Sequence, residues 1–349
     1  MSIQEYLQTN DLDAIVVTNL LNIRHLTGFS GSNALLLATR ARTIVITDFR
    51  YQEQIKRELK LEAEVVIAQV GLDTIISESL QDCKCIAFEG NYLTANQYDR
   101  YRALLIGKEL KLVDIDSLRL LKNAQEIAAT KQAADIANQA FSKLLTEIKV
   151  GMSEQQVAAL LDYYTRSMGA EKMAFDTIVA SGLHSAMPHA KPTSKPLNSG
   201  DLVTIDFGAV YAGYHSDMTR SFVMGCATDK QREVYNTVLQ AQLAALSLVQ
   251  VGVACSAVDK AARDIITTAG YGEFFGHATG HGTGLQIHEE PRLSSASQQL
   301  LQAGMLVTVE PGIYIPGFGG VRIEDLVAVT PHGQDVLTAQ IDKQLLEIH

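Results

Sequence analysis

The segments LNSGDLVTIDFG (197–208) and LQAGMLVTVEPG (301–312) carry one pattern twice, 104 residues apart. Six of their twelve positions are identical, and an acid stands at the same place in each copy, Asp206 in the first and Glu310 in the second. We expect each segment to form a strand that continues into a hairpin. The repeat therefore indicates that this part of the chain is built from two similar halves.

A weaker repeat lies upstream, between VGMSEQQVAALLDYYTRSMGAE (150–171) and VGVACSAVDKAARDIITTAGYG (251–272). Four residues recur at an offset of 101: Val150 and Val251, Gly151 and Gly252, Val157 and Val258, Gly169 and Gly270. Ser153 and Gln156 predict a capping box where the first of these helices begins. Each half should contain two helices followed by strands. Two copies of this length do not make a solenoid, so we expect one pseudo-symmetric domain.

The first 120 residues show a different pattern, in which short apolar runs alternate with helical stretches. The runs that predict strands are 14–18, 34–38, 43–47, 65–68 and 85–89, and residues 51–60 and 72–81 predict helices. This alternation predicts a small α/β domain. A long helix is expected next, at about 125–149. The chain has 349 residues, and at roughly 150 residues per domain we expect two domains, 1–122 and 123–349, in an α/β (α+β) fold.

The composition excludes several classes of protein. The chain has 29 basic and 39 acidic residues, a formal charge of −10, which disfavours binding to nucleic acid or to an anionic membrane. No apolar run is long enough for a membrane helix, and the first residues lack a signal-peptide pattern. Four cysteines in a chain of this length favour a reducing compartment. We therefore expect a cytoplasmic protein.

Two expected hairpins each bring a pair of carboxylates together. Asp206 and Asp217 flank VYAGY, which predicts a turn at Ala212-Gly213, so the two acids should lie nearly opposite on adjacent strands. Glu310 and Glu324 flank the glycine-rich PGFGG (316–320), and their midpoint is Gly317. Asp325 should point to the opposite face of its strand and is not counted with them.

Four converging carboxylates would repel one another, and some would stay protonated. Two divalent cations remove this difficulty, because their four positive charges balance the four negative ones. His281 stands among Gly280, Gly282 and Gly284, where small neighbours allow close approach to a metal. The alternative is that the acids are solvated strand residues and His281 a packing histidine. That alternative does not account for mirrored acid pairs together with a glycine-flanked histidine.

Other catalytic motifs are absent from the sequence. His288 and Glu289 do not begin HExxH, because Arg292 stands at the last position and Pro291 would break the helix. There is no GxSxG, and the glycines at 280–284 do not complete GxGxxG. Serine-hydrolase and dinucleotide-binding functions are therefore disfavoured.

The constellation resembles the prolidase/aminopeptidase P group of the pita-bread dinuclear metallopeptidases. The resemblance extends over the whole chain. The segments similar to the family's blocks are NIRHLTGFSGS (22–32), TDFRY (47–51), FDTIVASG (175–182), HSAMPHA (184–190), VTIDFG, SDMTR, TGHGTG, HEEPR, VTVEPGIYIP and GVRIED. This implies a creatinase/prolidase-type N-terminal domain followed by a pita-bread catalytic domain.

The resemblance also implies the ligands of two metal ions. They are Asp206 on one ion, Asp217 and Glu324 bridging both, and His281 and Glu310 on the other. Mn²⁺ suits this carboxylate majority, with Co²⁺ or Zn²⁺ as alternatives. A hydroxide bridging the metals would be the nucleophile, Glu310 would take its proton, and His288 would stabilise the tetrahedral intermediate.

The resemblance implies the substrate-binding residues as well. His189 would lie near the leaving side of the substrate, and Phe175 would form an apolar wall of the proline pocket. An arginine at the position of Arg292 clamps the free carboxylate of a dipeptide in prolidases, and a guanidinium suits that task. A surface role for Arg292 is the alternative.

The expected activity is therefore that of an Xaa-Pro dipeptidase acting on small peptides with proline in second position. The alternative is aminopeptidase P, which releases the residue before proline from longer peptides. Methionine aminopeptidase, a metal-free creatinase-like hydrolase and a catalytically inactive peptide-binding scaffold are less favoured. Relatives of this kind are commonly dimeric, so we expect a homodimer in which HLTGFSGS (25–32) helps to close the site.

Overall fold

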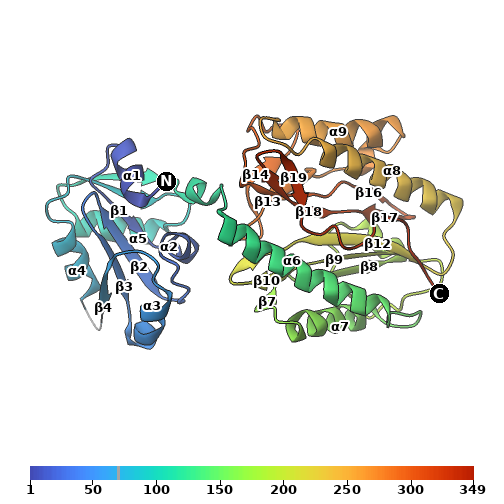
Figure 1. Ribbon diagram of the computed structural model, residues 1–349, viewed down its shortest axis with the longest axis horizontal. Helices are drawn as coiled ribbons and strands as arrows, with labels where there is room; N and C mark the ends of the chain where they lie inside the picture. The colour runs from blue at the N-terminus through green and yellow to red at the C-terminus, as the bar shows by residue number, and fades with distance from the viewer. Residues whose placement is uncertain (69–70) are drawn as a thin grey trace. The chain divides into compact units, whose positions relative to one another are not determined.

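The computed structural model describes residues 1–68 and 71–349, which form two compact units, Met1–Arg119 and Leu120–His349 (Figure 1). The expected α/β class is confirmed in both units. The five strands and two helices predicted in the N-terminal unit are all present, with ends within two residues of the expected ones.

The N-terminal unit is a six-stranded mixed sheet, in the order β4-β3-β2-β1-β5-β6, with helices around it. Its strands are β1 (Ala14–Val17), β2 (Ala34–Thr39), β3 (Thr43–Thr47), β4 (Glu64–Ile67), β5 (Cys85–Glu89) and β6 (Glu109–Val113). Its helices are α1 (Ile3–Thr9), α2 (Leu20–Thr27), α3 (Gln52–Glu58), α4 (Leu72–Ser79) and α5 (Ala95–Leu104). Alternate residues of β1 join two separate apolar clusters, so the sheet is covered on both faces.

The C-terminal unit repeats one order of elements, two helices followed by strands. The first half contains α6 (Ala124–Leu145), α7 (Glu154–Ser167), β7 (Lys172–Met173), β8 (Ile178–Ser181), β9 (Leu202–Phe207), β10 (Ala209–Tyr211), β11 (Tyr214–His215) and β12 (Met218–Met224). The second half contains α8 (Asp229–Ser247), α9 (Cys255–Thr268), β13 (Gly280–Gly282), β14 (Glu289–Leu293), β15 (Leu306–Val309), β16 (Gly312–Ile315), β17 (Gly319–Arg322), β18 (Asp325–Thr330), β19 (Gly333–Val336) and β20 (Glu347–Ile348). The internal duplication inferred from the sequence is therefore present in the fold, which is of the pita-bread type.

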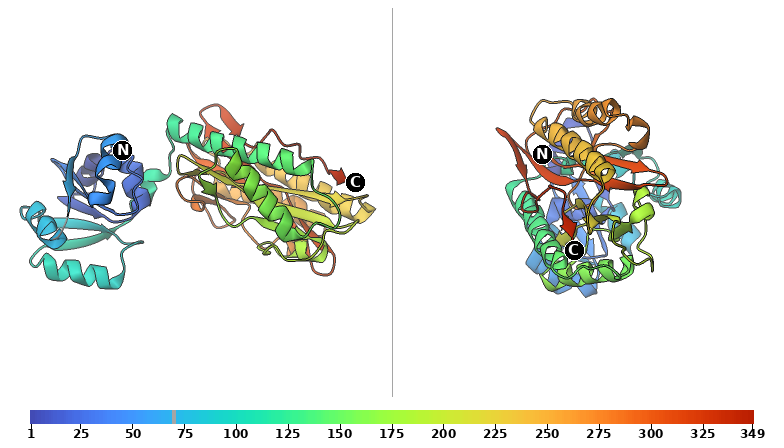
Figure 2. Two further views of the ribbon diagram at one scale, coloured as in Figure 1. Left: turned by 90° about the horizontal axis from the view of Figure 1, so that it is seen from below. Right: turned by 90° about the vertical axis from the view of Figure 1, so that its right-hand side faces the viewer.

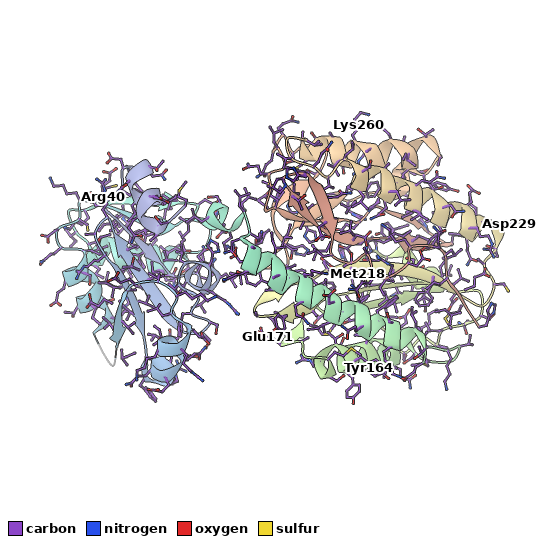
Figure 3. All side chains as sticks on the ribbon, viewed as in Figure 1. Arg40, Tyr164, Glu171, Met218, Asp229 and Lys260 are labelled. Atoms are coloured by element: carbon purple, nitrogen blue, oxygen red, sulfur yellow. The ribbon has the colours of Figure 1, made fainter. Side chains whose placement is uncertain are left out.

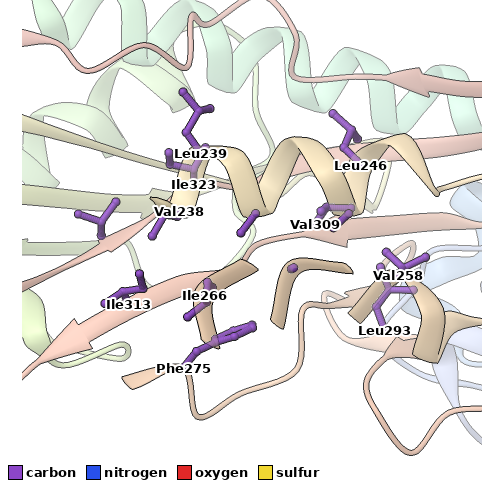
Figure 4. Close-up of a cluster of buried hydrophobic side chains, with 14 of the residues drawn as sticks. Val238, Leu239, Leu246, Val258, Ile266, Phe275, Leu293, Val309, Ile313 and Ile323 are labelled. Atoms are coloured by element: carbon purple, nitrogen blue, oxygen red, sulfur yellow. The ribbon is translucent and has the colours of Figure 1, made fainter. Parts of the chain in front are cut away.

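Each half has its own apolar core between its helices and its strands. In the first half, α6 and α7 pack against β8, β9 and β12, and Figure 2 shows these two helices lying across the strands. In the second half, α8 and α9 cover β15 and the β16–β17 hairpin, with Val238, Ile266 and Val309 in the cluster that Figure 4 shows. Met218, where β12 begins, lies inside the unit, whereas Lys260 projects from an outer helix (Figure 3).

Local signals in the sequence determine where several of these helices begin. The capping box predicted from Ser153 and Gln156 is confirmed, with the backbone N–H of Gln156 donating to Ser153 Oγ over 3.1 Å. Thr228 and Gln231 form another at the start of α8. The helix expected at about 125–149 ends earlier, at Leu145. Among the described residues, no helix combines the length and the apolar character needed to cross a bilayer.

Candidate metal centre

Asp206 and Asp217 come from one hairpin, whose turn lies at Ala212-Gly213 as predicted. Both turn residues have positive φ, 48° and 81°, which suits a tight two-residue hairpin turn. The register, however, pairs Asp206 with Thr219. The two acids are therefore offset by two residues and not directly opposite, which corrects the expected pairing. Positions offset in this way still lie on one face of the sheet.

Glu310 and Glu324 come from the second hairpin, which is centred on Gly317 as its sequence suggests. Val309 pairs with Asp325 and Gly312 with Arg322, so the same register places Glu310 opposite Glu324. A threonine hydroxyl fixes each carboxylate. Thr308 Oγ1 donates to Glu310 Oε1 over 3.1 Å, and Thr219 Oγ1 donates to Glu324 Oε2 over 2.6 Å.

His281 lies between the two acid pairs. Its Nε2 is 3.5 Å from Asp217 Oδ2 and 3.4 Å from Glu310 Oε1. Its Nδ1 is 3.0 Å from the carbonyl oxygen of Gly282, which turns Nε2 toward the acids. Ligand atoms of Asp217, His281 and Glu324 all lie within 4.8 Å of one another, and Asp217 and Glu324 are buried.

The electrostatics of the cluster match a site for cations. Burial, together with the neighbouring carboxylates, raises the pKa of Asp206 and raises the pKa values of Asp217 and Glu324 well above the usual range. Asp206 Oδ1 is buried and has no hydrogen-bond partner among the described residues. A set of oxygen donors with one imidazole fits divalent metal ions, and metal charge would allow all the carboxylates to ionise.

Asp325 differs from its neighbour Glu324, as the sequence suggests. It faces away from the cluster, where its two oxygens bind Arg220 at 2.9 Å and Lys343 at 2.7 Å. These cations hold the pKa of Asp325 down at about 2 although burial alone would raise it. It is therefore a structural ion pair and not a member of the metal cluster.

Sequence reasoning missed a hydrogen-bonded chain behind the cluster. Arg322 Nη2 donates to Asp206 Oδ2 over 2.7 Å, and Arg322 Nη1 donates to the hydroxyl of Tyr314 over 2.9 Å. That hydroxyl lies 3.0 Å from His277 Nε2, while His277 Nδ1 lies 2.8 Å from the carbonyl oxygen of Ala278. Burial raises the pKa of Tyr314 to about 12, so the phenol stays protonated. One signal could have identified Arg322, since it stands two residues before Glu324 and alternate residues of an extended chain point to the same face.

The glycines on either side of His281 allow close packing between neighbouring segments of backbone. A Cβ on Gly280 would lie 1.9 Å from the carbonyl oxygen of Thr308, and one on Gly282 would lie 2.2 Å from that of Glu290. Side chains at these two positions would therefore collide with neighbouring backbone. They allow neighbouring backbone to approach the strand that carries His281.

A cavity of about 510 Å³ opens onto the cluster. Its lining includes all five expected ligands together with Phe175, His189, His288 and Arg292. His288 lies just before β14, and its ring centroid is 4.4 Å from that of His281. Arg292 is exposed and pairs directly with His281 across the β13–β14 ladder, so both side chains leave the same face.

The duplicated fold and this cluster define a metal-dependent enzyme of the pita-bread class. Comparison with known families gives a match to "Metallopeptidase family M24" over residues 128–331 and to "Creatinase/Prolidase N-terminal domain" over residues 1–121. The chain belongs to metallopeptidase family M24.

Individual relatives are similar over almost the whole chain. A Xaa-Pro dipeptidase of Pyrococcus furiosus is 38% identical, over 98% of this chain and 97% of the relative. The solved structure of a Xaa-Pro dipeptidase from Bacillus anthracis is 40% identical, with a TM-score of 0.95, covering 99% of this chain and 97% of that one. The structure of an X-Pro aminopeptidase from Thermotoga maritima is 36% identical, with a TM-score of 0.91, covering 97% and 98% of the two chains.

Proposed function

We propose that this metallopeptidase is a Xaa-Pro dipeptidase that hydrolyses the bond before a C-terminal proline. The observation that carries the proposal is the pairing of Arg292 with His281 across one ladder, in the cavity that holds the acid cluster. In a dipeptide, the free carboxylate lies one residue, at most about 3.6 Å of chain, beyond the bond that is cut. An arginine adjacent to a metal-ligand position is therefore placed to bind that carboxylate.

The metal ligands are assigned as the resemblance to the family implies. Asp206 would hold one ion, Asp217 and Glu324 would contribute to both sites, and His281 and Glu310 would complete the second site. Mn²⁺ suits this oxygen-rich donor set. Two ions held there would polarise the scissile carbonyl and lower the pKa of a coordinated water. The unpartnered Asp206 Oδ1 and the raised pKa values of Asp217 and Glu324 support this assignment.

The remaining side chains act on protons and on the position of the substrate. Glu310 binds Thr308 through Oε1, and its Oε2 accepts the proton of the attacking water. His288, whose pKa is lowered by burial and by nearby His281, is neutral near pH 7 and donates a hydrogen bond to the developing oxyanion. His189 is assigned to the leaving side of the substrate, where the proline nitrogen must gain a proton.

Phe175 supplies apolar surface for the proline ring, which lacks an N–H donor. It lines the same cavity as His189 and is partly buried. The homodimer and the cytoplasmic location remain predictions, which sedimentation analysis and cell fractionation would test.

The experiment compares Ala-Pro, its amide and the tripeptide Ala-Pro-Ala on Mn²⁺-loaded protein. We expect Ala-Pro to be the preferred substrate, and its amide to be cut about 10 to 100 times less efficiently, as suits the loss of a hydrogen bond to a charged group. Arg292→Ala should lose the preference for the free acid and leave cleavage of the amide unchanged. Arg166→Ala, at an exposed arginine of α7, is the matched control and should behave as wild type.

The tripeptide distinguishes the alternative activity. Relatives under both names share this fold, and preference for Ala-Pro-Ala with no effect of Arg292→Ala would make the chain an Xaa-Pro aminopeptidase. Absence of turnover on all three peptides with metal bound would exclude both activities.

A further inference from the structure

Cys226, Glu347 and His349 form a second group of potential metal ligands. One ligand atom from each lies within 4.8 Å of the others. Among the described residues, the only other group that converges this closely is the one formed by Asp217, His281 and Glu324. Unlike that group, this one contains a thiol and lies at the surface.

The backbone holds these three residues in place. Strand β20 pairs in parallel with the end of β12, with Val223 beside Glu347. The pairing continues past the strand, because the amide of Gly225 donates to the carbonyl oxygen of Ile348 over 2.6 Å. Figure 2 shows β20, the dark red arrow beside the C label, at the end of the unit where α8 begins. Cys226 therefore lies in the loop after β12, next to the residue whose main chain bonds to Ile348, the neighbour of His349.

The donor atoms are available for a ligand. The amide of Ala227 donates to Glu347 Oε1 over 2.7 Å, and the Arg232 guanidinium contacts the same oxygen. These contacts orient the carboxylate, and among the described residues no hydrogen bond reaches Oε2. In the part of the chain that the structure describes, the Cys226 thiol and the His349 ring also have no hydrogen-bond partner, and the thiol is not in a disulfide.

The chemistry of the three donors differs from that of the first cluster. A thiolate, an imidazole and a carboxylate suit Zn²⁺, which takes three protein ligands and a water in a tetrahedral site. Soft thiolate ligands disfavour Mn²⁺, which prefers oxygen. Asp217 precedes β12 and Cys226 follows it, and an extended strand of that length keeps them about 25–30 Å apart. The two sites are therefore separate.

We propose that Cys226, Glu347 and His349 bind Zn²⁺ or a similar thiophilic divalent cation. The bound ion holds β20 against the loop between β12 and α8. On binding, the thiol releases its proton to solvent and sulfur bonds to the metal. The ion joins segments that are more than 120 positions apart in the sequence, and so stabilises the C-terminal segment without taking part in peptide hydrolysis.

The test measures how fast Cys226 reacts with Ellman's reagent in the Mn²⁺-loaded protein, with and without added Zn²⁺. Cys226 is exposed and the other three cysteines are buried, so the fast phase of the reaction reports on this thiol alone. At Zn²⁺ ten times above Kd, mass action leaves about one tenth of the thiol uncoordinated, and the reaction should slow about tenfold. Added Mn²⁺ should leave the rate unchanged.

His349→Ala should remove the protection by Zn²⁺ and leave the unprotected rate as in wild type, while His332→Ala, at another exposed histidine, should keep the protection. Co²⁺ provides a second measurement, because a thiolate-to-cobalt charge-transfer band can arise here and not at the first cluster, which has no sulfur. The band should be absent in Cys226→Ser. Unchanged Cys226 reactivity in Zn²⁺, or equal protection in His349→Ala, would overturn the proposal.

Discussion

The guanidinium of Arg322 lies against the carboxylate of Asp206, with Nη2 2.7 Å from Oδ2, and both belong to the wall of the cavity. Arg322 also donates to Thr219 Oγ1 over 3.0 Å and to the carbonyl oxygen of Pro188 over 3.2 Å. One buried side chain thus fixes Asp206, a hydroxyl that binds Glu324, and the loop that carries His189.

Replacing Arg322 by lysine should impair catalysis more than folding. A lysine keeps the positive charge but cannot make four directed contacts, and small displacements of catalytic groups cost about a hundredfold in rate. We expect kcat on Ala-Pro to fall by about that factor while thermal unfolding stays cooperative. Arg100→Lys, in an exposed ion pair with Asp73, is the control. Wild-type kcat in Arg322→Lys would show that the contact is dispensable.

Glu154 should make stability depend on pH. This buried carboxylate accepts bonds from the Ser181 amide at 2.8 Å and the Thr193 amide at 3.0 Å, besides hydroxyl contacts and His184. Burial favours a higher pKa, but the bonds from His184, Thr193 and Ser181 outweigh it and lower the pKa of Glu154 below its ordinary value of 4.5. Its contribution to stability is therefore complete above that value and is lost as the pH falls through the lowered pKa.

Glu154→Gln should consequently destabilise the protein by about 1–3 kcal/mol at pH 7. The difference from wild type should shrink below pH 4.5, as Glu154 itself becomes protonated. Urea unfolding of both proteins at several pH values measures it, with the exposed Glu53→Gln as control. A difference that does not change with pH would contradict the lowered pKa.

Metal removal should destabilise the wild-type protein. It should also reverse the sign of the stability change that Glu324→Gln causes. Without metal, Glu324→Gln relieves repulsion in the cluster and should melt at a higher temperature than wild type. When the free metal concentration is one hundred times Kd, binding should raise the free energy of unfolding of the wild-type protein by about 2.7 kcal/mol. The increase in Glu324→Gln should be much smaller. Calorimetry with and without chelator makes the comparison. An equal gain in the two proteins would remove Glu324 from the set of ligands.

The ion pair between Lys122 and Glu289 should hold the neighbouring His288 in position. The two side chains are 3% and 5% exposed, and Nζ is 2.9 Å from Oε2. Because Glu289 follows His288 directly, Lys122→Met should lower kcat and destabilise the protein by about 3–5 kcal/mol. Adding Glu289→Gln should recover part of the stability. The free energies of unfolding are measured in urea. If the effects of the two substitutions simply add in the double variant, the two charges are not coupled.

The sequence predicted the elements whose signals are local. The turn at Ala212-Gly213, the hairpin centre at Gly317 and the capping box at Ser153 all follow from turn and cap chemistry. The offset of two residues between Asp206 and Asp217 follows from that turn, because Tyr211 pairs with Tyr214 and counting outward pairs Asp206 with Thr219. Helix α5 was not predicted, since only Tyr101 of its residues is buried and no apolar periodicity results.

The duplication places Asp206 and Glu310 at equivalent positions, whereas the full set of five candidate ligands came from the resemblance to the family; all five line one cavity. The chain from Arg322 through Tyr314 to His277 was not, because its members lie 8 and 37 residues apart and meet only in the folded unit. The close packing of Gly280 against Thr308 is also a property of the sheet that a single sequence does not display.

The most direct test of the central claim is the rate of Ala-Pro hydrolysis by chelator-treated protein as Mn²⁺ is added back. We expect no turnover in the metal-free protein, restoration that saturates when about two ions are bound per chain, and no restoration in Asp217→Asn. Full turnover by metal-free protein, or undiminished turnover in Asp217→Asn, would contradict it.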